Sequence, residues 1–91
     1  MSITIRIPTA MRVFTGGLAE VAASGKTLGA VLDDMETKHR GIKVALCDRQ
    51  GQPLRFVAIF VNGVDVRTLQ GLETPVSPDA EIDIVTAIAG G

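Results

Sequence analysis

The residues of this chain best suited to chemistry are its last two, Gly90 and Gly91. Neither carries a Cβ atom, so the end of the chain is narrow enough to enter the active site of another protein. The C-terminal carboxylate of Gly91 then becomes an acyl group that a partner enzyme can reach and activate. Ile88 and Ala89 precede it, with side-chain bulk falling toward the end. Two terminal glycines also arise by chance or as a cloning remnant, and the tail by itself leaves both interpretations open.

Three other features could carry chemistry, and each has a simpler structural interpretation. Residues 24–27 (Ser-Gly-Lys-Thr) resemble the end of a phosphate-binding loop, but the upstream glycine is missing, and Thr27 fits better as a helix N-cap. The one histidine, His39, is expected at a helix C-terminus, where a cation is favourable. The one cysteine, Cys47, lies among apolar residues, as a small buried side chain does. No catalytic set or metal-ligand spacing emerges, so we expect a carrier on which separate enzymes act, with no bound metal or cofactor.

The composition limits the partners and the compartment. The chain has 91 residues, of which 46% are hydrophobic and only 3% aromatic, so a single aliphatic core is expected. Nine basic residues nearly balance ten acidic ones, which argues against nucleic acid as a partner because a phosphate backbone attracts a basic surface. No apolar run approaches the ~18 residues of a membrane span, and the N-terminus lacks the pattern of a signal peptide. One cysteine cannot form an internal disulfide, so a cytoplasmic location is expected.

The first half of the chain predicts two strands followed by a helix. Isoleucines alternate with polar residues over residues 3–7, as in a half-buried strand that Pro8 ends. Residues 8–17 are too long for a tight hairpin and are interpreted as a loop, and residues 18–23 as a second strand. From Leu28 the apolar spacing changes to that of an amphipathic helix of about three turns.

The second half predicts one irregular helical turn and three more strands. Residues 42–46 are short and apolar, as in a single turn that closes the edge of a core. Residues 55–61 form an apolar strand, and Asn62-Gly63 is a strong hairpin signal that leads into a short returning strand over 64–66. The alternating residues 81–85 predict the closing strand, which runs into the tail.

This order of elements predicts an α+β fold in which one main helix packs on one face of a mixed sheet of four to five strands. We expect the globular domain over residues 1–87 and a flexible diglycine tail over residues 88–91. One helix covers only one face of the sheet, whereas the strand over 55–61 is apolar on both. Phe56, Ala58 and Phe60 are therefore expected to form a docking surface for a partner protein.

Several segments together resemble the β-grasp, ubiquitin-like proteins of the MoaD/ThiS family of sulfur carriers, and within it the CysO type. The resemblance covers nearly the full length of the chain. The segments that carry it are the Ile-Pro-Thr segment at 7–9, Thr-Gly-Gly at 15–17, the helix start at 27–32, the strand and turn at 55–63, Asp-Val-Arg at 65–67, Gly71-Leu72 and Ala-Gly-Gly at 89–91.

The resemblance implies a reaction cycle centred on Gly91. An activating enzyme of the MoeB/ThiF kind, using ATP and Mg²⁺, would adenylate the Gly91 carboxylate and convert it to a thiocarboxylate. The sulfur would then pass to an acceptor, for the CysO type in a pyridoxal-phosphate cysteine synthase. A zinc metallopeptidase would release the cysteine and regenerate Gly91. Ile88, Ala89 and Gly90 would thread the tail into these enzymes.

Other functions within and outside the family stay open at this point. The small subunit of molybdopterin synthase and the thiamin-type sulfur carriers use the same kind of tail. A ubiquitin-like modifier would share the adenylation step and then join Gly91 to lysines of target proteins. An interaction domain with an inert tail would need only the Phe56 and Phe60 surface.

Overall fold

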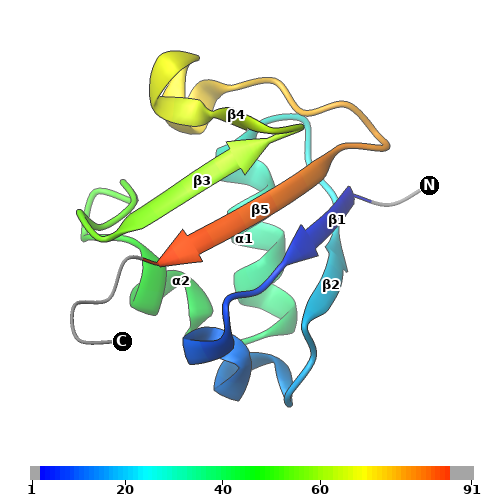
Figure 1. The fold of residues 1–91 in the computed structure, drawn as a ribbon, viewed down its shortest axis with the longest axis vertical. Coiled ribbons are helices and arrows are strands. Elements are labelled where there is room, and N and C mark those ends of the chain that lie inside the picture. Colours follow the sequence, from blue (N-terminus) through cyan, green and yellow to red (C-terminus); the bar gives the residue numbers. More distant parts are fainter. Residues whose placement is uncertain (1–2, 87–91) are drawn as a thin grey trace.

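Five strands form one mixed sheet in the order β2-β1-β5-β3-β4, in a computed structural model that describes residues 3–86 (Figure 1). The two N-terminal strands are antiparallel, β1 is parallel to β5, and β3 is antiparallel to both β5 and β4. The elements are β1 (Ile3–Arg6), the 3₁₀ helix η1 (Thr9–Thr15), β2 (Glu20–Ala23), α1 (Leu28–Lys38), α2 (Ile42–Leu46), β3 (Val57–Val61), β4 (Val64–Asp65), the 3₁₀ helices η2 (Val66–Thr68) and η3 (Gly71–Glu73), and β5 (Glu81–Thr86).

Helix α1 covers one face of this sheet and lies behind it in Figure 1. Its stripe of Leu28, Val31, Leu32 and Met35 is buried, as the spacing predicts. The Thr27 hydroxyl oxygen accepts a hydrogen bond from the Ala30 N–H at 3.2 Å, which confirms Thr27 as the N-cap. The predicted α+β fold, with a mixed five-stranded sheet and one main helix, is confirmed.

The core lies between α1 and the alternate side chains of the strands. Isoleucine, valine and alanine side chains on β1, β2, β3 and β5 point toward the helix, while the residues between them point to the opposite face. The predicted helical turn is α2, whose Ile42 and Leu46 close one end of the core. The Asn62-Gly63 hairpin is also confirmed, since both residues have the positive φ values, 50° and 84°, of a type I′ turn.

Several predicted element boundaries are wrong. The returning strand predicted over 64–66 ends at Asp65, because Val66 begins η2. Residues 8–17 contain η1 rather than only a loop, because Met11 and Thr15 turn into the core. The second strand begins at Glu20, and Leu18 is exposed before it. The strand predicted over residues 55–61 begins only at Val57, because the Val57 N–H donates to the Leu54 carbonyl across a turn that contains Phe56.

Candidate functional site

The predicted reactive tail starts directly beyond the described residues. Ile88, Ala89, Gly90 and Gly91 lie outside them, as does the predicted domain boundary at residue 87. The structure instead describes what holds the tail, namely β5, which ends at Thr86 and lies between β1 and β3 (Figure 1). β5 is paired with β1 as far as Asp83 and with β3 as far as Thr86, so the last described residue before the tail is held in the sheet.

The face of the sheet opposite α1 carries a small apolar patch, formed by Ala58, Phe60 and Val85. The register places Ala58 directly opposite Val85, and Phe60 is the next residue of β3 on the same face. Ala58 and Phe60 are half-buried, and Val85 is 48% exposed. Directly opposed side chains in antiparallel strands are in contact. The patch therefore reaches to within one residue of the end of β5.

Phe56 lies one residue before the start of β3 and is not part of the strand. The prediction that it belongs to the strand is wrong. Phe56 lies in the turn before β3, and its side chain is 41% exposed. The alternation of a strand therefore does not place Phe56 beside Phe60, and its part in docking stays a prediction.

Acidic side chains surround Arg6 on the same open face. Its guanidinium lies 2.7 Å from Glu81, 3.1 Å from Asp83 and 3.7 Å from Glu20. The hydrogen bonds to Glu81 and then Asp83 raise the pKa of Arg6 above its ordinary value. Three carboxylates against one guanidinium leave this part of the face negatively charged. A partner that combines an apolar surface with basic residues would complement it.

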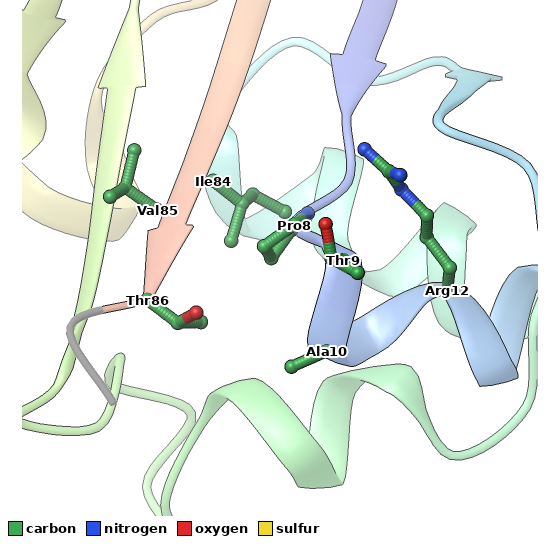
Figure 2. Close-up of a pocket in the computed structure, with 7 residues that line it drawn as sticks. All are labelled: Pro8, Thr9, Ala10, Arg12, Ile84, Val85 and Thr86. Atoms are coloured by element: carbon green, nitrogen blue, oxygen red, sulfur yellow. The ribbon is translucent and has the colours of Figure 1, made fainter. Parts of the chain in front are cut away.

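A groove beside the end of β5 was not predicted from the sequence. Figure 2 shows that it lies between two segments far apart in the chain, the residues that follow β1 and the last residues of β5. Most of its lining is apolar, and Arg12 supplies the one charged side chain. The signal in the sequence was Pro8, which ends β1 and turns the chain away from β5. The lining residues are Pro8, Thr9, Ala10, Arg12, Ile84, Val85 and Thr86.

The other sequence candidates have structural roles in the described residues. The Ser24 N–H of the phosphate-loop-like segment donates to the Asp34 carboxylate at 2.9 Å, a partner that would repel phosphate. His39 caps the C-terminus of α1. Cys47 is buried, and burial raises the pKa of its thiol, which therefore stays protonated at neutral pH and is a poor nucleophile.

Residues 3–86 contain neither a cluster of metal ligands nor a membrane-spanning helix. In this range no three His, Cys, Asp or Glu side chains come close enough together to hold a metal ion. None of the helices described there has both the length and the apolar character needed to cross a bilayer.

The class of protein follows from the sheet order and the single main helix packed on one face: the fold is a β-grasp, ubiquitin-like fold whose central strand, β5, is the last element of the described residues. The model of the ThiS family matches residues 5–91, so the chain belongs to this family. The match includes the tail that the structure does not describe.

Relatives of known name support the same placement. The chain is 45% identical to the sulfur carrier protein CysO of Mycobacterium tuberculosis over 93 residues, which cover the whole of both chains. A chain in the crystal structure of the Amycolatopsis orientalis BexX/CysO complex is 40% identical and superposes with a TM-score of 0.92, covering 98% of this chain and 99% of that one. The small archaeal modifier protein 1 of Methanosarcina acetivorans, with 24% identity, a TM-score of 0.83, and coverage of 99% and 96%, shares the fold.

Proposed function

We propose that this protein is a sulfur carrier that delivers sulfur from a thiocarboxylate on Gly91, for the biosynthesis of cysteine. The observation that carries this proposal is the ThiS family match, which extends through the last residue of the chain. The full-length similarity to proteins named CysO supports it. In this function the chain is a carrier and co-substrate, and separate enzymes perform every catalytic step.

The first step gives the tail a reactive acyl group. The carboxylate of a C-terminal residue has a pKa of about 3.5, so it is ionised at neutral pH and is a poor electrophile. An activating enzyme of the MoeB/ThiF kind joins a Gly91 carboxylate oxygen to the α-phosphorus of ATP, and pyrophosphate leaves. A sulfide-level nucleophile then attacks the acyl carbon, AMP leaves, and Gly91 becomes a thiocarboxylate. ATP and Mg²⁺ bind to the activating enzyme.

The second step transfers the sulfur. The thiocarboxylate sulfur is an ionised nucleophile and forms a bond to the β-carbon of an activated serine in a pyridoxal-phosphate cysteine synthase. The carbon–oxygen bond to the activated hydroxyl breaks, the activating group leaves with that oxygen, and a thioester joins Gly91 to the new cysteine. The amine of this cysteinyl group attacks the carbonyl carbon of Gly91, the thioester carbon–sulfur bond breaks to leave a free thiol, and an amide forms. A zinc metallopeptidase then hydrolyses this amide. Free cysteine and the original Gly91 carboxylate are the products, so the carrier returns to its starting state.

In this function, residues 3–86 position the tail and bind the partner enzymes, and they carry out no chemical step themselves. Pairing of β5 with β3 reaches Thr86, which fixes the root of the tail. The apolar patch of Ala58, Phe60 and Val85 lies next to that root and would hold the globule against each enzyme. A narrow tail can then enter a closed active site, where exclusion of water protects the acyl intermediates from hydrolysis.

Intact-mass spectrometry tests the proposal. We expect the full-length chain, incubated with the activating enzyme, ATP, Mg²⁺ and a sulfide source, to gain the mass difference between one sulfur and one oxygen atom. A variant without Gly91 should gain nothing and should unfold at the same temperature, because its core is intact. Full-length protein that is adenylated but never gains sulfur would contradict the proposal. Higher-mass conjugates with other proteins would favour a modifier instead.

A further inference from the structure

The end of β5 has a strand neighbour on one side only. Pairing between β1 and β5 runs from Thr4 opposite Glu81 to Arg6 opposite Asp83 and then stops. On the other side, pairing of β5 with β3 continues to Thr86. The Arg6–Asp83 pair of this parallel ladder uses the Ile84 N–H. Within residues 3–86, the β1-facing edge of β5 therefore has no strand partner from the Ile84 carbonyl to Thr86, and this edge forms one wall of the groove in Figure 2.

The backbone groups at this edge can be assigned from two hydrogen bonds. The Glu81 carbonyl accepts from the Asn62 N–H at 2.8 Å, toward β3, and the Ala80 carbonyl accepts from the Thr4 N–H at 3.1 Å, toward β1. Because backbone groups alternate in direction along a strand, the N–H and carbonyl of Ile84 and Thr86 point toward the β1 side. If β1 continued, the residue whose N–H would face the Ile84 carbonyl is Pro8, and proline has no N–H to donate.

Arg12 gives the groove a positive charge that no acidic side chain of residues 3–86 pairs with. Its Nε donates to the Ile7 carbonyl at 3.1 Å, which holds the guanidinium in place. No carboxylate of residues 3–86 forms an ion pair with Arg12, whereas Arg6 has three such partners. A held guanidinium with its terminal nitrogens available fits a carboxylate from outside.

We propose that the groove receives an extended backbone segment of the enzyme that activates Gly91. That segment adds a short strand beside residues 84–86, hydrogen-bonded to the Ile84 carbonyl and the Thr86 N–H, and places an Asp or Glu side chain on Arg12. Apolar contacts with Pro8 and Ala10 line its other side. This inference rests on the proposed function, since it names how the partner of that function docks.

The length of the tail supports an enzyme segment as the occupant. Gly91 is five residues beyond Thr86, and a fully extended chain of that length spans at most about 18 Å. An active site that holds the Gly91 carboxylate must therefore lie within about 18 Å of the end of β5, which forms one wall of the groove. An enzyme surface this near the end of β5 is within reach of the unpaired edge, which offers backbone hydrogen bonds and the charge of Arg12.

Two substitutions at Thr86 isolate the backbone hydrogen bond. Thr86→Pro removes the N–H that faces the groove without removing a bond to β3, and proline is tolerated at unpaired strand positions. We expect the KM of the activating enzyme for this variant, measured by ATP–pyrophosphate exchange, to rise about five- to tenfold, the effect of one lost hydrogen bond. Thr86→Val loses the hydroxyl but keeps the N–H, so its KM should rise much less. Thermal unfolding of both variants checks that β5 is intact.

A second pair of variants isolates the charge. Arg12→Gln should raise KM about tenfold at low salt and reduce the salt dependence of KM, because an ion pair with the enzyme is lost. Arg49→Gln is the matched control: Arg49 is exposed, lies outside the groove, and should leave KM unchanged.

Amide hydrogen exchange supplies a readout that does not depend on turnover. Binding of the activating enzyme without ATP should slow exchange of the Thr86 N–H. Unchanged exchange, together with wild-type KM values for Thr86→Pro and Arg12→Gln, would overturn the inference, while sulfur gain by the wild-type chain would still support the proposed function. Protection in the isolated chain that disappears on removal of residues 87–91, or that depends on concentration, would also overturn it, because the occupant would be the tail or a second copy.

Discussion

Glu36 shows how one carboxylate joins two helices. It lies in the last part of α1 and accepts hydrogen bonds from the N–H groups of Gly41 and Lys43, each at 2.9 Å. These donors belong to the start of α2, where no earlier turn of helix can use them. The Gly41 bond and then the Lys43 bond lower the pKa of Glu36, because they stabilise the charged form.

The lowered pKa of Glu36 predicts a pH-dependent contribution to stability. A carboxylate whose pKa is lower in the folded state stabilises the fold above its unfolded pKa of about 4.3, and this contribution is lost as the pH falls through the folded pKa. Glu36→Gln should therefore lower the free energy of unfolding at about pH 7, and the difference from wild type should shrink under acidic conditions. Urea unfolding of both proteins at neutral and at acidic pH measures this difference in the free energy of unfolding.

Glu73→Gln is the control for the Glu36 prediction. Glu73 is exposed, and its side chain makes no hydrogen bond or ion pair with the rest of residues 3–86. Its substitution should change stability little at either pH. A difference between wild type and Glu36→Gln that is the same at both pH values would show that the charge of Glu36 is not responsible.

At the scale of elements, the turn into α1 depends on a close approach of backbone to backbone. An added Cβ at Gly25 would lie 2.7 Å from the Val31 nitrogen and 2.8 Å from the Ala30 carbonyl carbon. Backbone atoms of a helix cannot move aside as a side chain can. Gly25 of the segment that resembles a phosphate-binding loop is therefore explained by its close packing against α1.

Alanine at two neighbouring glycines should have opposite effects. Gly25→Ala forces β2 and α1 apart and should cost roughly 1–3 kcal/mol of unfolding free energy. Gly29→Ala places its Cβ 3.4 Å from the Leu72 carbonyl oxygen, an ordinary contact, inside a helix where alanine is favoured over glycine by up to about 1 kcal/mol. Chemical denaturation of both variants measures the two effects, and a Gly25→Ala protein as stable as wild type would disprove the close approach.

At the scale of the whole molecule, one face of the sheet packs in the core and the other face is open to a partner protein. The face under α1 holds the core, whereas the opposite face carries the apolar patch, the acidic cluster around Arg6 and, at its end, the root of the tail. All three features of the open face converge on β5. A partner can therefore bind the globule and take the tail with one continuous surface.

The apolar patch predicts unequal effects for two phenylalanines. Phe60→Ala should raise the KM of the activating enzyme about tenfold or more, as truncation of an aromatic residue at the centre of an interface does. Phe56→Ala should raise it less, because Phe56 lies in the turn before β3. Both variants need a thermal unfolding curve to show that the fold is retained, and equal KM values would place the docking surface elsewhere.

The sequence by itself determined the features that depend on residues close together in the chain. The stripe of α1, the Thr27 cap and the Asn62-Gly63 turn follow from spacing and turn chemistry within a few residues. Within the candidate site, the same local reasoning selected Ala58 and Phe60 and directed attention to Gly91.

Only the tertiary structure decided which distant segments share a surface. Arg6 meets Glu81 and Asp83, and Pro8 and Arg12 meet the end of β5, across more than 70 residues of chain. The spacing of residues within one segment does not predict where β1 ends relative to β5. The register between these strands is set by the packing of both on the common core. The groove and its unpaired edge arise from that register.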